Sequence, residues 1–194
     1  MRKVFIFLVS TVLFAACGNS DKPAEPTPQP AAPMAKGKNS DAFNQSFDRV
    51  LTNYIHLKDN FITEGLAMID FYAIETSKSI DSLKYNEIKG EAGIAENTKS
   101  FAESMKAELK GLVGEKDLVK KRKSFNMLTD QFYNLIRIVQ YNQKVIYHFH
   151  YAEAFTDGDP NAFWLSTSKD VKNPYNASKL LEGEIADSLD YSKQ

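Results

Sequence analysis

The sequence of 194 residues is poor in cysteine and tryptophan, with one residue of each, and its charges nearly balance. A single cysteine excludes a framework of disulfides and a zinc site built from several cysteines. The 24 basic residues stand against 25 acidic residues, which is a formal net charge of −1. A nucleic-acid binder needs a basic surface to neutralise phosphates, so we expect no nucleic-acid partner.

Familiar catalytic motifs are also missing. The chain has no Gly-x-Ser-x-Gly elbow, no glycine-rich phosphate-binding loop and no His-Glu-x-x-His zinc motif. Among its many carboxylates, no pair stands out by its spacing. We therefore predict that the protein is not an enzyme, and we assign it no catalytic residue and no resident cofactor.

The N-terminal residues 1–16 are typical of a targeting segment. Arg2 and Lys3 form a positive end, and residues 4–16 form an apolar stretch. A membrane-spanning helix needs roughly 20 apolar residues, so this stretch fits a signal peptide instead. Small residues stand directly before Cys17, and this arrangement resembles a bacterial lipobox. It implies a mature chain that begins at Cys17 and carries lipid there.

Residues 17–39 are predicted to be a linker that follows the lipidated cysteine. Five of the seven prolines fall in this stretch. Such a composition cannot pack a core and favours extended, semi-rigid conformations. Several acyl chains on one residue are sufficient for stable anchoring. We predict a lipoprotein that contacts the membrane through its anchor, on the periplasmic face of the outer membrane.

The remaining residues, 40–194, are predicted to form one helical domain. Large apolar residues recur at alternating spacings of four and three, which is the helical period. The first such stripe consists of Phe43, Phe47, Val50, Tyr54, Leu57 and Phe61. Further stripes, the first of them less regular, run over residues 66–83, 94–112 and 115–141. The predicted fold is all-α, an antiparallel four-helix bundle with an irregular C-terminal segment packed on it.

A basic run, residues 120–123, lies near the start of the fourth predicted helix. Four cations within one turn are most simply explained as a solvated helix face. We therefore predict a solvated face that offers at best a weak charged patch.

Residues 145–155 show partial alternation of apolar and polar residues, so this segment is either extended or a continuation of the helix. In an extended strand, His148 and His150 point to one face and offer two imidazoles to one metal ion. Glu153 is close enough in sequence to be a third ligand. If the segment is helical, the two imidazoles diverge and the site fails. A short last helix is expected near residues 178–189.

The C-terminal segment carries a family resemblance. Trp164-Leu165-Ser166 stands seven residues before Asn173-Pro174-Tyr175, downstream of Lys123-Ser124-Phe125. Together these motifs resemble the domain of unknown function 3347, over roughly residues 45–190. The resemblance implies a helical-bundle domain of the kind found in Bacteroidota, often in lipoproteins or attached to heavy-metal efflux adaptors. The tryptophan and the Pro-Tyr pair are predicted to hold the C-terminal segment against the bundle.

The resemblance also implies a metal site that this chain has lost. Family members carry a Cys-Pro-Met motif and a later Met followed by Cys-Gly, and such soft ligands suit a copper-like ion. At the corresponding places this chain has Tyr151-Ala152-Glu153 and Leu180-Leu181-Glu182-Gly183, with no sulfur.

Two functions follow from these observations. The first is a lipid-anchored cell-envelope protein whose helical bundle is a non-enzymatic interaction module, with another envelope protein as a possible partner. The alternative is a periplasmic accessory of heavy-metal efflux that binds copper or zinc through His148 and His150.

Overall fold

Four helices make up most of the computed structural model, which describes residues 37–90 and 93–192. They are α1 (Asp41–Ile62), α2 (Leu66–Asp81), α3 (Ile94–Gly114) and α4 (Leu118–Val139). A single 3₁₀ turn, η1 (Tyr85–Glu87), lies between α2 and α3. The prediction of four helices is confirmed. The predicted signal peptide (1–16), Cys17 and the linker as far as residue 36 lie outside the described residues.

The helix ends follow local signals in the sequence. The Ser40 side chain accepts a hydrogen bond from the Phe43 amide (3.2 Å) and caps α1, and the Asp117 carboxylate does the same for α4 (2.9 Å from the Lys120 amide). Glu64 ends the first helix with a left-handed backbone (φ 56°). None of the helices among the described residues combines the length and the apolar composition needed to cross a membrane.

The core forms where the helical stripes meet. All six stripe residues of α1 are fully buried: Phe43, Phe47, Val50, Tyr54, Leu57 and Phe61. Aromatic rings join α1 to α4, with centroids 5.6 Å apart for Phe47 and Phe132 and 5.3 Å apart for Tyr54 and Phe125. Burial of each such ring contributes about 1.5–3 kcal/mol. The stripe predicted from sequence is therefore the surface along which α1 packs on α4.

The C-terminal part contains a β-sheet, so the prediction of a purely all-α fold is wrong there. The strands are β1 (Ile146–Tyr151), β2 (Ala162–Ser166) and β3 (Glu184–Leu189), antiparallel in the order β2-β1-β3. The last helix expected at 178–189 is also wrong, because only a 3₁₀ turn, η2 (Ala177–Lys179), precedes β3. Gly183 (φ 137°) takes a backbone unsuited to a helix, and pairing with β1 satisfies the β3 backbone.

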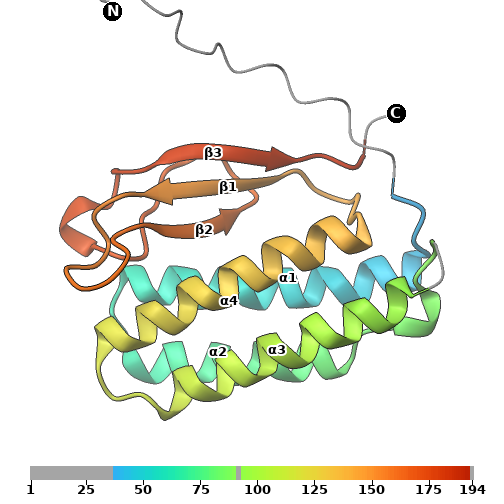
Figure 1. Ribbon diagram of the computed structural model, residues 1–194, viewed down its shortest axis with the longest axis horizontal. Coiled ribbons are helices and arrows are strands. Elements are labelled where there is room, and N and C mark those ends of the chain that lie inside the picture. Colours follow the sequence, from blue (N-terminus) through green and yellow to red (C-terminus); the bar gives the residue numbers. More distant parts are fainter. Residues whose placement is uncertain (1–36, 91–92, 193–194) are drawn as a thin grey trace, which may run out of the picture. The chain divides into compact units, whose positions relative to one another are not determined.

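The described elements stack in three layers (Figure 1). The sheet lies along α4 and α1, and α2 and α3 lie on the opposite side of that helix pair. The helix-facing side of the sheet is joined to the core at Tyr54, whose hydroxyl accepts the Leu165 amide hydrogen bond (3.1 Å) and is 2.7 Å from the Thr129 hydroxyl. This arrangement leaves α2 and α3 with faces that no described element covers.

Candidate functional site

His148 lies on β1 in the layer between sheet and helices. Its ring stacks on Tyr133 of α4 (4.3 Å between centroids) and on Phe163 of β2 (4.8 Å). Loss of solvation lowers the pKa of His148 to about 4, although the nearby Asp187 carboxylate opposes this shift. At neutral pH the residue is a neutral aromatic ring in a packed layer.

His150 lies on the same face of β1, because the segment is extended, which was one of the two predicted alternatives. Its Nε2 is 2.7 Å from the Asn161 carboxamide oxygen and its Nδ1 is 3.3 Å from a Glu184 oxygen. The Phe163 ring contacts both imidazoles, with centroids 4.8 Å from His148 and 5.0 Å from His150. Both nitrogens of His150 therefore face side chains of this chain.

The third predicted ligand, Glu153, forms a salt bridge with Lys179 (3.1 Å). Among the residues that the structure describes, no three His, Cys, Asp or Glu side chains are arranged to hold a metal ion. The proposed site of His148, His150 and Glu153 stays a prediction.

His150 and Glu153 nevertheless share one acidic groove of about 340 Å³ with Glu182, Gly183 and Glu184. The groove joins the turn after β1 to the segment before β3. These are the two places where the family resemblance implies sulfur motifs. The fold thus brings both positions together, and in this chain they present carboxylates.

The tryptophan motif of the resemblance lies on β2. Trp164 is fully buried and stacks on Phe149, with the two rings 5.0 Å apart and 6° from parallel. A Cβ atom at position 183 would lie only 2.4 Å from the Trp164 ring, so the close approach of the backbone to this ring requires glycine. The Ser166 hydroxyl accepts a hydrogen bond from the Ser168 amide (3.0 Å) and shapes the turn after β2.

The Asn-Pro-Tyr motif fastens the C-terminal segment to α4. The Asn173 side chain accepts the Tyr175 amide hydrogen bond (2.8 Å), and the Pro174 carbonyl accepts one from Arg122 Nε (2.9 Å). The Tyr175 hydroxyl donates to the Phe163 carbonyl (2.5 Å), and burial raises its pKa well above the ordinary value. The motif residues therefore face the protein interior.

The basic run corrects a prediction, because two of its four residues are buried. Lys121, 1% exposed, donates to an Asp70 oxygen (2.5 Å) and to the Leu112 carbonyl (2.7 Å). Arg122 donates to the Phe61 and Pro174 carbonyls and pairs with Glu64. Both side chains point between helices, where the carbonyls at the ends of α1 and α3 need donors.

The outer face of α2 is apolar and exposed, and this was not predicted from the sequence. Four of its large apolar side chains stay 42–50% exposed: Leu66, Met68, Phe71 and Ile74. The opposite face of the same helix is buried through Ile69, Ala73 and Ile80. A helix that is apolar on both sides is normally covered on both sides. The irregular stripe over residues 66–83 was the signal for it.

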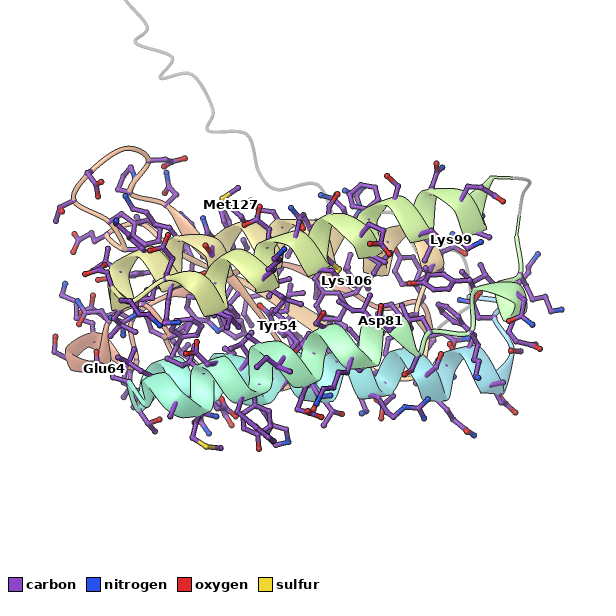
Figure 2. The ribbon with its side chains drawn as sticks, turned by 90° about the horizontal axis from the view of Figure 1, so that it is seen from below. Tyr54, Glu64, Asp81, Lys99, Lys106 and Met127 are labelled. Carbon is purple, nitrogen blue, oxygen red and sulfur yellow. The ribbon has the colours of Figure 1, made fainter. Side chains whose placement is uncertain are left out.

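A groove of about 520 Å³ runs between α2 and α3 beside this face. Ile74, Ala107 and Val113 form part of its apolar lining, and Lys78 and Lys110 stand at its edge. Lys106 crosses the groove to Asp81 (2.6 Å), and Figure 2 shows the two side chains between the helices. We call Met68, Phe71 and Ile74 the α2 strip.

The family model described as Protein of unknown function (DUF3347) matches residues 50–144. This match confirms the resemblance inferred from sequence, over most of α1 and all of α2, α3 and α4. It ends before β1, so the sheet with His148 and His150 lies beyond it, as do the Trp164 and Tyr175 motifs. Comparison with curated proteins and with solved structures gives no match.

Proposed function

We propose that this chain, which matches the DUF3347 family over residues 50–144, is a lipid-anchored cell-envelope protein whose bundle is a non-enzymatic interaction module. The observation that carries the proposal is the α2 strip, an exposed apolar surface beside the α2–α3 groove. Surfaces of this kind on otherwise well-packed domains are typical of protein interfaces. Cys17 and the proline-rich residues after it supply the anchor and the spacer.

The anchor is tested by metabolic labelling of the full chain with an alkyne-bearing fatty acid. We expect label in the wild-type chain and none in Cys17→Ala. Label that persists in the variant, or wild-type chain recovered unlabelled in the aqueous fraction, would contradict the proposed anchor.

The interaction module is tested by photocrosslinking in the native membrane. Benzoylphenylalanine replaces Phe71 in the α2 strip or, as a control, Met127, a similarly exposed apolar residue (52%) on α4. We expect crosslinked products from position 71 and few from position 127. An absence of products at position 71 would remove the structural support for an interaction module.

The acidic groove favours one alternative, a metal-binding accessory of efflux. His150 and Glu153 line it together, and Glu182 and Glu184 add carboxylates. Calorimetric titration of the full chain with Cu(I), Cu(II) and Zn(II) tests this function. A dissociation constant below about 1 μM that is lost in the double variant His148→Ala, His150→Ala would support it. Binding that survives the double variant would place the metal elsewhere.

A further inference from the structure

The three exposed apolar side chains of the α2 strip are spaced symmetrically about Phe71. Phe71 is at the centre of the exposed face, with Met68 three residues before it and Ile74 three residues after it. Glu64 lies seven residues before Phe71 and Lys78 seven residues after it. Helical rise places Lys78 about 10.5 Å from Phe71 along α2, and Glu64 lies beyond the other end of the strip, in the turn before α2 begins at Leu66.

We infer that the α2 strip is the contact by which two copies of this chain pair, with their α2 helices antiparallel about a two-fold axis at Phe71. This inference rests on the proposed interaction function and names its partner. In that arrangement Phe71 meets Phe71 of the second copy, and each Met68 meets an Ile74. Each Lys78 meets a Glu64, so two identical ion pairs close the ends of the contact.

The exposure and present bonding of these charges are compatible with the pairing. Lys78 is 67% exposed and pairs with Glu75 within its own helix turn (2.7 Å). Glu64 is 47% exposed and meets Arg122 through one carboxylate oxygen (3.0 Å). Figure 2 shows Glu64 at the start of α2, the end opposite to Asp81. Formation of the pair therefore does not require a buried salt bridge to be broken.

The charge pattern favours a second copy over a partner of one charge sign. Around the strip and groove, Lys78, Lys106 and Lys110 are interspersed with Glu64, Glu75, Asp81 and Glu103. A strongly acidic or basic partner would meet like charges on this surface. In the antiparallel register, the positions opposite Glu64 and Lys78 carry the complementary sign, and the positions between them are mainly apolar.

The proposed anchor also bears on how strong this contact must be. One helix face per copy makes a small interface, and small interfaces associate weakly in solution. Chains that share a membrane surface meet at a much higher effective concentration than free chains do. A weak two-fold contact is then sufficient for pairing.

The test compares charge variants of the full chain by sedimentation equilibrium in detergent. The wild type is expected to show a reversible monomer–dimer equilibrium, and Phe71→Glu to be monomeric. Lys78→Glu and Glu64→Lys are each expected to weaken association roughly tenfold, because one substitution turns two attractions into two repulsions. An equimolar mixture of these two variants is expected to form a heterodimer at near wild-type affinity.

Circular dichroism at the same concentrations verifies that each variant is folded, and Lys99→Glu on α3 is the matched control that changes the charge by the same amount. A wild type that stays monomeric, or single variants that associate as strongly as the wild type, would overturn the pairing. A mixture of Lys78→Glu and Glu64→Lys that fails to restore association would also overturn the pairing.

The photocrosslinking at position 71 separates this inference from the proposed function. A product with the mass of two chains supports both. A product that contains only another protein overturns the pairing and leaves the interaction module in place. An absence of any product contradicts both.

Discussion

The buried salt bridge of Lys121 allows a direct test of how the bundle is held together. Lys121 joins three helices, because it lies on α4, pairs with Asp70 of α2 and donates to the Leu112 carbonyl of α3. The substitution Lys121→Met keeps the length and most of the apolar volume of the side chain. It removes the charge and both hydrogen bonds without creating a cavity.

The size of the effect can be worked from the structure. Removing one partner of a buried ion pair costs about 3–5 kcal/mol when the other charge stays buried. The Asp70 side chain is 32% exposed, so water can solvate part of the carboxylate left behind. The Leu112 carbonyl loses the Lys121 donor but still accepts a hydrogen bond from the Glu115 amide (3.3 Å), so it is not left unpaired. We expect a net loss of about 2–3 kcal/mol, which lowers the melting temperature by roughly 5–10 °C.

Urea titration of the full chain, followed by circular dichroism, measures the free energy of unfolding. Lys120→Met is the matched control, since the adjacent lysine is exposed, and its change is expected within about 0.5 kcal/mol. In a double-mutant cycle, Asp70→Asn is expected to cost less in the Lys121→Met background than alone. Equal stability of the Lys121→Met and Lys120→Met variants would refute the assigned role of this salt bridge.

Three further predictions concern the sheet and its attachment. The pKa of His148 is about 4 in the folded chain and near 6.5 unfolded, so the unfolded chain protonates first as pH falls. Stability should therefore decline between pH 6.5 and pH 4, and less so in His148→Phe, as urea midpoints would show. Tyr54→Phe leaves the buried Leu165 amide without its acceptor and should cost about 1–3 kcal/mol in urea titration. Gly183→Ala should displace the Trp164 ring and shift the emission of this single tryptophan to longer wavelength.

Each of these three predictions has a matched substitution elsewhere in the chain. His56→Phe, on the exposed side of α1, is the matched histidine substitution, and Tyr147→Phe should cost less than Tyr54→Phe. Gly114→Ala meets no atom within 4 Å and should leave the emission as it is. Equal effects of a variant and its control would contradict the corresponding contact.

The hydrophobic period allowed the four helices to be predicted from sequence. This signal is local, since it depends on residues three or four apart. The C-terminal segment was harder to predict because β3 exists only by pairing with β1, more than 30 residues earlier in the chain. Strand pairing at such a distance leaves little trace in a local pattern.

The features of the candidate sites also divide into those that the sequence predicted and those that only the structure revealed. The sequence alone determined the order of the four helices and the apolar stripe of α1. Only the tertiary structure decided that Lys121 and Arg122 are buried, that Glu153 pairs with Lys179, and that the α2 strip stays uncovered. The physical reason is that burial depends on which element packs against a residue, whereas helical periodicity reveals only that some face must be covered.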